Sequence, residues 1–256
     1  MASLPFETAL VTGASSGIGE AMVRLLGRAG IPTVIVARRS DRLEALSAEH
    51  ACLEPLVADL ATDDGVRSVE SEIARRGLDL VVNNAGFGTS GLFHSLDPDR
   101  LDREVAVNIR ALTRLSHAAL RTMVPRGRGH LLNVSSVASF QPAPSLAVYA
   151  ATKAFVTSLT ESLHEEVRGT GVKVTALYPG LTRTEFISVS SPDGRSATYP
   201  EFMWLESEEV AAAALSDMAR GRALSIPGAI YRGLVAASTV TPRSIARRLS
   251  SRVRRD

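Results

Sequence analysis

A tyrosine and a lysine four residues apart, Tyr149 and Lys153, form the pair in this sequence that is best suited to acid–base chemistry. The apolar residues after them recur at helical spacing, so both side chains are expected on one face of a helix. A free phenol has a pKa of about 10, and a cation at roughly 4 Å in a partly shielded site favours the phenolate by about 4 kcal/mol. The pair therefore predicts a tyrosine acid–base catalyst whose pKa is lowered by the lysine.

The composition makes a chance pairing harder to accept. The chain has 27 arginines and only two lysines, Lys153 and Lys173. An ammonium is a compact point charge and a guanidinium is a wide planar fork, so the two are not interchangeable. This chain uses arginine for almost all of its positive charges, so a lysine one turn after Tyr149 is an exception. The pair alone is also compatible with an ordinary amphipathic helix that carries both residues on its solvent-exposed face.

Length and composition narrow the class of protein. The 256 residues, 45% of them hydrophobic, suffice for one large core. The single cysteine, Cys52, excludes an internal disulfide and fits a reducing compartment. No apolar run approaches the roughly 18 residues of a membrane span and no signal-peptide pattern opens the chain, so a cytoplasmic protein is expected. The five histidines are scattered without ligand spacing, so no metal site is expected.

Short apolar runs alternate with helical stretches along the chain. Strands that are apolar throughout their length indicate a parallel sheet covered on both faces, which predicts a doubly wound α/β fold of about seven strands. Ligands of such folds bind at the carboxyl ends of the strands. The predicted strands are Thr8–Thr12, Thr33–Ala37, Pro55–Ala58, Leu78–Asn83, His130–Ser135, Val172–Tyr178 and a weaker Ala223–Ile226.

The first predicted strand runs directly into a glycine-rich turn and then a helix. Three glycines let the backbone turn tightly and approach a pyrophosphate, while the helix N-terminus offers amide donors to the negative charge. This position in the fold predicts a dinucleotide site, with a turn that binds nothing as the alternative. The candidate contacts are Gly13, Ser15, Ser16, Gly17, Ile18 and Gly19.

The second predicted strand ends in two arginines, Arg38 and Arg39. In dinucleotide folds an acid about 20 residues beyond the glycines binds the ribose 2′-hydroxyl, whereas an arginine there accommodates a 2′-phosphate. Arg38 lies 19 residues after Gly19, and the first acid is Asp41. The pattern predicts NADP(H), with plain surface arginines as the alternative.

Polar or small residues end the next two strands. Asp59, followed by Leu60, can bind an adenine amino group or can simply form a turn. Asn83, Ala85 and Gly86 end the fourth strand, where small residues let a cofactor lie close to the backbone.

A helix is expected to begin at Pro98, with Leu101, Val105 and Leu112 on its buried stripe. Asn108 interrupts that stripe. A polar residue at a buried position needs a partner, so Asn108 is either a satisfied core amide or a link in a proton path.

The longest irregular stretch is expected at about 188–201. Loops of this length inside a compact domain are usually lids or disordered. We expect a lid at about 186–206 over an apolar substrate pocket, although the apolar side chains could equally pin the loop to the body. Those side chains are Phe186, Ile187, Tyr199, Phe202, Met203 and Trp204.

The C-terminal segment is strongly basic. Six arginines fall within 243–255, opposed only by Asp256, and apolar residues recur every four positions among them. Such a helix can lie on an anionic membrane or dock on a partner, but a solvated terminus is the commoner outcome. No nucleic acid partner is expected.

These motifs together resemble the short-chain dehydrogenase/reductase family over about residues 6–190. The resemblance implies that Tyr149 is the general acid/base and that Lys153 lowers its pKa and holds the nicotinamide ribose. It also implies that Ser136, 13 residues before Tyr149, binds the substrate oxygen and that Asn108 continues a proton relay through water. The motifs that carry it are Thr12–Gly19, Asn83–Gly86, Asn108, Ser136, Tyr149, Lys153 and Pro179-Gly180, with further cofactor contacts at Thr182 and Thr184.

The resemblance implies an NADP(H)-dependent oxidoreductase that interconverts a carbonyl and an alcohol. The cofactor would supply the hydride and Tyr149 the proton. The alternative is a dinucleotide-binding sensor or scaffold without turnover. Residues 1–241 would form the catalytic domain and 242–256 a basic tail, and the family implies a homodimer or homotetramer. Ser15 and Ser16 are neutral where many NADP-preferring members carry a basic residue, so the cofactor preference depends on the arginines after the second strand.

Overall fold

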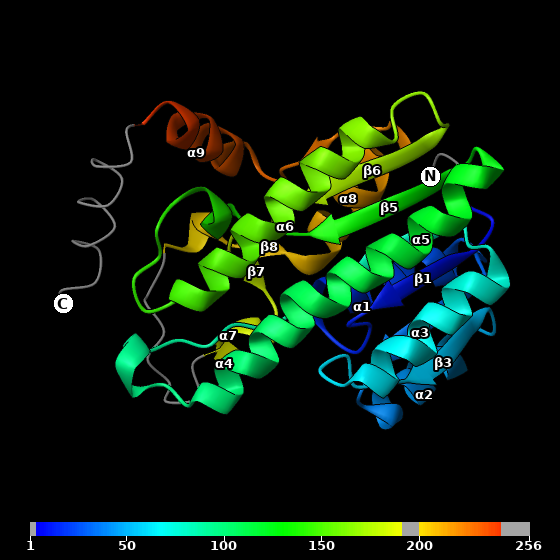
Figure 1. The fold of residues 1–256 in the computed structure, drawn as a ribbon, viewed down its shortest axis with the longest axis horizontal. Coiled ribbons are helices and arrows are strands. Elements are labelled where there is room, and N and C mark those ends of the chain that lie inside the picture. Colours follow the sequence, from blue (N-terminus) through cyan, green and yellow to red (C-terminus); the bar gives the residue numbers. More distant parts are fainter. Residues whose placement is uncertain (1–3, 191–199, 242–256) are drawn as a thin grey trace.

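A seven-stranded parallel sheet forms the centre of the computed structural model, which describes residues 4–190 and 200–241 (Figure 1). The strand order is β3-β2-β1-β4-β5-β6-β9, so the order reverses between β1 and β4, the point where such folds bind ligands. All seven predicted strands are present, with bounds that differ by no more than two residues. They are β1 (Ala9–Thr12), β2 (Thr33–Ala37), β3 (Leu53–Val57), β4 (Leu80–Asn83), β5 (Gly129–Val134), β6 (Val172–Leu177) and β9 (Leu224–Ser225).

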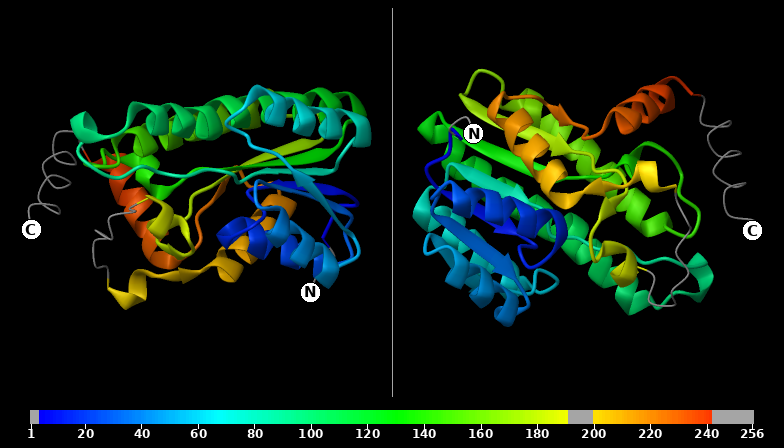
Figure 2. Two further views of the ribbon diagram at one scale, coloured as in Figure 1. Left: turned by 90° about the horizontal axis from the view of Figure 1, so that it is seen from below. Right: turned by 180° about the vertical axis from the view of Figure 1, so that it is seen from behind.

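Helices cover both faces of the sheet (Figure 2). Along β1, Ala9 and Val11 belong to one hydrophobic core and Leu10 belongs to the other. Because successive strand residues point to opposite faces, a sheet with two cores needs apolar residues at every strand position. One face carries α1 (Gly17–Arg28), α2 (Ser40–Glu49) and α8 (Ser207–Ala219), and the other carries α3 (Asp63–Arg76), α5 (Leu112–Arg126) and α6 (Ala147–Glu166).

The shorter elements gather beyond the carboxyl ends of the strands (Figure 1). Two of them, β7 and β8, pair with each other in parallel. These elements are η1 (Phe93–Ser95), α4 (Pro98–Val105), η3 (Val137–Phe140), β7 (Thr182–Arg183), α7 (Phe186–Ser190), η4 (Glu201–Met203), β8 (Leu205–Glu206) and α9 (Ala229–Val240).

A π-helical turn, η2 (Ala106–Ala111), joins α4 to α5 and changes which residues of α4 are buried. The helix begins at Pro98 as predicted, and the Asp97 side chain caps it. The prediction of Val105 as buried is wrong, because Val105 is 40% exposed and Glu104 is 0% exposed. A π turn adds one residue to the helical repeat, so the inner stripe before it moves back by one position.

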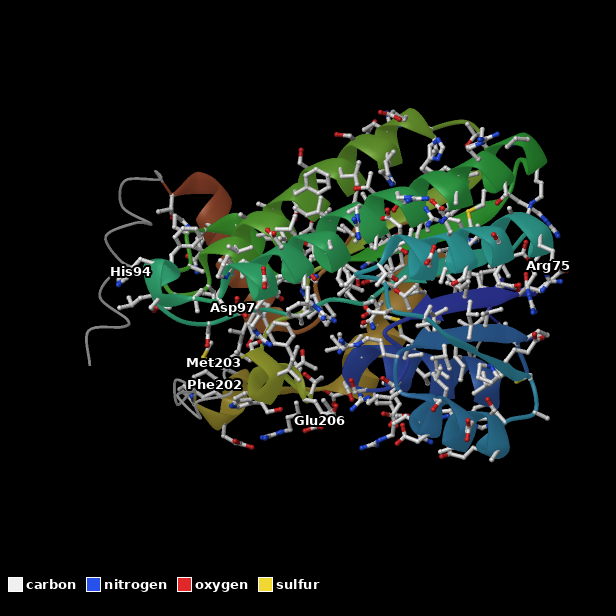
Figure 3. All side chains as sticks on the ribbon, turned by 60° about the horizontal axis from the view of Figure 1, so that its bottom comes forward. Arg75, His94, Asp97, Phe202, Met203 and Glu206 are labelled. Carbon is white, nitrogen blue, oxygen red and sulfur yellow. The ribbon has the colours of Figure 1, made fainter. Side chains whose placement is uncertain are left out.

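The predicted lid falls between β7 and β8. Irregular structure was expected from residue 188, but residues 188–190 belong to helix α7. Figure 3 shows Phe202 and Met203 at the same end of the molecule as His94 and Asp97, far from Arg75. Residues 191–199, including Tyr199, and the predicted tail 242–256 lie outside the described residues. Within the described part of the chain, no helix is both long and apolar enough to cross a membrane.

Candidate active site

The glycine turn packs so closely on the end of β4 that side chains do not fit. Gly13 has φ 67°, and a Cβ there would lie 2.8 Å from the Cα of Ala85. A Cβ on Gly19 would lie 2.3 Å from the carbonyl oxygen of Gly13. Both positions therefore require glycine. No side chain caps α1 after Ser16, so its first amide groups are available to an anion, which fits a pyrophosphate.

Asn84, which sequence reasoning passed over, ties this turn to β4. Its Nδ2 donates to the carbonyl oxygens of Thr12 (2.9 Å) and Gly13 (3.2 Å). The side chain of Asn83 instead points into the interior, where its Nδ2 donates to Oδ1 of Asn133 (2.9 Å). The two adjacent asparagines at a strand end were the available signal, because successive strand residues face opposite sides.

The two arginines after β2 lie in different environments. Arg38 is exposed and makes no hydrogen bond or ion pair that involves the described residues. Arg39 is fixed, because its Nη2 donates to the Ser15 carbonyl (2.9 Å) and its Nη1 donates to Glu185 (2.9 Å). Of the two, Arg39 is thus bound to the glycine turn, and Arg38 is the one whose guanidinium has no partner among the described residues.

Asp59 has a structural role at the end of β3. It accepts a hydrogen bond from the Ala61 amide (3.0 Å) and pairs with Arg103 (3.2 Å), while Leu60 is buried in the core. This is the turn arrangement that was the alternative to adenine binding, and an adenine contact stays a prediction.

Tyr149 and Lys153 share one face of α6, as their spacing predicts. The Lys153 Nζ lies 5.7 Å from the centroid of the Tyr149 ring and donates to the Val134 carbonyl (2.7 Å). Both residues are buried, and the Tyr149 ring packs against Phe186 at a centroid distance of 5.1 Å. The pair therefore lies at the carboxyl end of β5, under helix α7.

Burial governs the charge state of this pair. Desolvation raises the pKa of Tyr149 to about 12, against the opposing effect of the Ser136 hydroxyl, and Glu104 raises it further. Desolvation also lowers the pKa of Lys153 to about 8, although Glu104 acts to raise it. The pKa of Tyr149 is thus raised where a lowered value was expected, because burial disfavours the phenolate; a lowering effect of Lys153 stays a prediction. A phenol with a raised pKa is suited to donate a proton.

The two adjacent serines after β5 have separate roles. Ser135 is turned away, because its hydroxyl donates to the Lys153 carbonyl (2.8 Å) within α6. Ser136 begins η3, where its hydroxyl accepts from the Ala138 amide (3.1 Å), and it interacts with the Tyr149 hydroxyl. The structure therefore brings Ser136, rather than Ser135, next to the phenol.

Asn108 lies in the π turn, and both polar atoms of its side chain make hydrogen bonds. Its Nδ2 donates to the Phe87 carbonyl (2.9 Å) and to Thr152 Oγ1 (3.0 Å), and its Oδ1 accepts from the Phe87 amide (3.1 Å). A Cβ on Gly86 would lie 3.0 Å from Asn108 Oδ1 and 3.4 Å from Lys153 Nζ. Asn108 is thus a satisfied core amide next to the lysine, and its role in a proton relay stays a prediction.

Helix α9, which lies much later in the sequence, contacts and supports the segment after β6. Gly180 lies against Tyr231 of α9, since a Cβ at Gly180 would be 2.1 Å from the ring. The Tyr231 hydroxyl accepts from the Leu181 amide (3.0 Å) and donates to the Met203 carbonyl (2.6 Å). Sequence reasoning missed Tyr231, and no local pattern around it pointed to this contact.

The next residues of this segment reach the glycine turn. Thr182 donates to the Gly180 carbonyl (3.0 Å), while the carbonyl of Pro179 accepts from the Val137 amide (3.1 Å). A Cβ on Gly17 would lie 2.8 Å from the methyl group of Thr184. Thr184 therefore packs directly on the turn, and the residues predicted from two distant parts of the sequence meet here.

These features agree with a comparison of the whole sequence, since residues 7–194 match the model of the short chain dehydrogenase family. The chain belongs to the short-chain dehydrogenase/reductase family. An uncharacterized oxidoreductase from Myxococcus xanthus (strain DK1622) is 38% identical to it, over 75% of this chain and 78% of the relative. This short-chain dehydrogenase is accordingly an oxidoreductase, and nicotinamide dinucleotides are the typical cofactors of its family.

Solved structures of the family resemble it closely. A short-chain dehydrogenase from Sphingobium yanoikuyae in complex with NADPH is 35% identical with a TM-score of 0.82, covering 91% of this chain and 93% of that one. A bulky-bulky ketone specific alcohol dehydrogenase from Comamonas testosteroni is 31% identical with a TM-score of 0.77, covering 91% and 92%.

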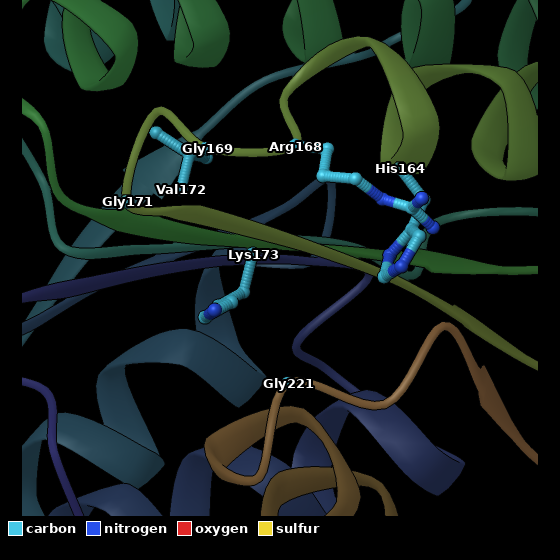
Figure 4. A pocket seen from close by; sticks show the side chains of 7 residues that line it. All are labelled: His164, Arg168, Gly169, Gly171, Val172, Lys173 and Gly221. Atoms are coloured by element: carbon cyan, nitrogen blue, oxygen red, sulfur yellow. The ribbon is translucent and has the colours of Figure 1, made fainter.

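Figure 4 shows a separate hollow of this dehydrogenase. It is lined by His164, Arg168 and Lys173 among others, next to the start of β6. Tyr149 and Lys153 lie at the opposite, carboxyl end of the strands, so the hollow is not part of this site.

Proposed function

We propose that this protein is an NADP(H)-dependent oxidoreductase that interconverts a carbonyl and an alcohol. The observation that carries the proposal is the buried group of Tyr149, Lys153, Ser136 and Asn108 next to the glycine turn. When bound, the cofactor supplies or accepts a hydride at the substrate carbon. The protein must then transfer one proton and stabilise the negative charge on one oxygen.

Each catalytic side chain has a distinct part in carbonyl reduction. The Tyr149 phenol donates its proton to the substrate oxygen as negative charge develops there. The Ser136 hydroxyl donates a hydrogen bond to the same oxygen. Lys153, with a pKa of about 8, is mostly protonated at pH 7, so its charge favours the phenolate that forms after the transfer. Alcohol oxidation uses the same groups in reverse.

The preference for NADP(H) is supported by Arg38 and by a relative. Arg38 is the open guanidinium at the position where a 2′-phosphate is bound in this fold. The Sphingobium yanoikuyae structure, 35% identical, is a complex with NADPH. The neutral residues Ser15 and Ser16 leave Arg38 as the main determinant.

The substrate is proposed to be an apolar carbonyl compound or alcohol of low molecular mass. Phe186 packs against the Tyr149 ring, and a Cβ on Gly88 would lie 3.2 Å from Phe186, so apolar atoms surround the phenol. The Comamonas testosteroni relative is specific for bulky-bulky ketones. A cytoplasmic location stays a prediction.

A homo-oligomer is also proposed, formed through the outer faces of α5 and α6. These faces carry a groove lined by Leu120, Leu159 and Leu163, among others. Val124 and Phe155 are exposed hydrophobic residues on the same two helices.

Substitution of Tyr149 tests the function. Tyr149→Phe should lower kcat/KM by about 10²- to 10⁴-fold, because it removes only the transferred proton. The Kd for NADPH, measured by fluorescence titration, should stay within about twofold of wild type. The assay is a panel of ketones and alcohols with NADPH, NADH and their oxidised forms. A variant that keeps most of its activity would contradict the proposal, and tight NADPH binding with no turnover of any panel member would favour a non-catalytic sensor.

A further inference from the structure

The only fully buried side chain of α4 is a carboxylate, Glu104. No hydrogen bond of ordinary geometry reaches either of its oxygens among the described residues, and its nearest polar neighbour is Thr89, which interacts with it through side chain and backbone. A carboxylate is rarely buried completely unless its charge is used, because its removal from water is unfavourable. Its position was not predictable from helical periodicity, because the π turn moves it inward.

Glu104 lies behind the loop that borders the catalytic residues. It is one turn before Asn108, and Thr89 of the loop lies beside it. Along the same loop, a Cβ on Gly88 would lie 3.2 Å from the Tyr149 ring, and one on Gly86 would lie 3.4 Å from Lys153 Nζ. Helix α4 also packs on α6 directly. Glu104 therefore lies buried on a helix that packs on α6, beside the loop that borders the catalytic pair.

The ionisable groups that face Glu104 are Arg100 from α4 itself and Tyr149 and Lys153 from α6. Burial raises the pKa of Glu104, while the Thr89 hydroxyl and then the charges of Arg100 and Lys153 act to lower it. In return, Glu104 acts to raise the pKa of both Tyr149 and Lys153. The negative charge of Glu104 thus acts in the same direction on Tyr149 and Lys153. It stabilises the protonated form of each.

We propose that Glu104 is a positioning residue of the active site, whose buried carboxylate holds the Lys153 ammonium and the Tyr149 hydroxyl in their protonated forms. The consequence for catalysis rests on the proposed function. Carbonyl reduction needs Tyr149 protonated at the start, whereas alcohol oxidation needs it to accept a proton. Glu104 therefore favours reduction at neutral pH and moves oxidation toward alkaline pH.

The lysine composition provides a direct test that needs no substrate. The chain has only Lys153 and Lys173, so lysine-selective isotope labelling gives two NMR signals. Lys173 lies in the distant hollow of Figure 4 and serves as the internal reference. In Glu104→Gln the pKa of Lys153 should fall by about one unit below its wild-type value, as expected for loss of a nearby charge in a partly shielded site.

The matched control is Asp102→Asn, which removes an exposed carboxylate from the same helix. This control should leave the Lys153 titration unchanged. An unchanged Lys153 titration in Glu104→Gln overturns the proposal, whether or not the protein turns out to be a reductase. If Glu104→Gln does not fold, Glu104→Met, which fills a similar volume without charge, replaces it in the same measurement.

The pH profile tests the catalytic consequence separately. In Glu104→Gln the alkaline limb of carbonyl reduction and the acid limb of alcohol oxidation should both move to lower pH by about one unit, because Tyr149 and Lys153 lose their protons more easily. A residue that only supported the fold would lower the rate at every pH without moving either limb. Profiles that superimpose on wild type, together with a shifted Lys153 titration, would overturn the catalytic part alone.

Discussion

Tyr149 illustrates how two opposing effects set the chemistry of one side chain. Removal of the phenolate from water disfavours it, while a hydrogen bond with the Ser136 hydroxyl favours it less strongly, and the pKa rises to about 12. The Lys153 ammonium is bound to the Val134 carbonyl, which directs its charge toward the strand end. At the residue scale, the site is prepared to give a proton to a substrate oxygen.

Arg38 is the residue on which the cofactor preference depends. In Arg38→Asp, a carboxylate would repel a 2′-phosphate and could accept a hydrogen bond from a 2′-hydroxyl. The ratio of kcat/KM for NADPH over NADH should fall by about 10- to 100-fold, the size of one charged hydrogen bond. Arg75→Asp, at the far end of the molecule, is the control and should leave the ratio unchanged (Figure 3). An unchanged ratio in Arg38→Asp would refute the phosphate role.

At the scale of elements, α9 contributes to a site formed by residues far from it in sequence. One buried phenol, Tyr231, bonds to the strand-end segment at Leu181 and to the flank of the predicted lid at Met203. Because β7 and β8 also pair, the described residues on the two sides of the predicted lid are held at two points. The helix therefore helps to fix these two flanking segments.

Removal of the Tyr231 hydroxyl tests this brace. Tyr231→Phe keeps the ring against Gly180 but removes the partner of a partly buried amide and a partly buried carbonyl, so the free energy of unfolding should fall by about 1–3 kcal/mol. The KM for NADPH should rise, because the segment from Pro179 to Thr184 is less well held. Urea denaturation and steady-state kinetics measure the two effects. Leu234→Ala, an exposed residue on the same helix, is the control; equal behaviour of the two variants would show that the hydroxyl has no such role.

At the scale of the whole molecule, the layer formed by α4, α5 and α6 carries a leucine-lined groove together with exposed hydrophobic residues. Val105, Val124 and Phe155 are 40%, 38% and 39% exposed on these helices, and Val124 lines the groove. Exposed apolar patches on a protein with well-formed cores are typical of interfaces. The face lies on the side of the sheet away from α1 and α8, which leaves the glycine turn accessible.

Phe155→Arg tests whether this face joins copies of the chain. The wild-type protein should sediment as a dimer or tetramer at micromolar concentration, and the variant should shift toward monomer, because an unpaired guanidinium in an apolar interface is unfavourable. Analytical ultracentrifugation measures the masses. Ile230→Arg places the same charge on an exposed apolar residue of α9 and should not change the mass. A monomeric wild-type protein would contradict the oligomer proposal.

Much of the fold followed from the sequence because the signals are local. The seven strands are short apolar runs, the α4 start is marked by Asp97-Pro98, and the glycine turn is recognisable from residue spacing. The same local logic placed Tyr149 and Lys153 on one face of a helix. It failed at Val105, because a π turn several residues later changed the phase of the helix.

The sequence by itself determined the family, the sheet and the acid–base pair, since periodicity and spacing report on neighbours along the chain. Only the tertiary structure decided the protonation of that pair, the inward position of Glu104, the fixation of Arg39 by Glu185 and the brace from Tyr231. Each of these depends on desolvation or on a contact between residues far apart in the sequence. Such contacts are set by how the layers pack, which no local pattern records.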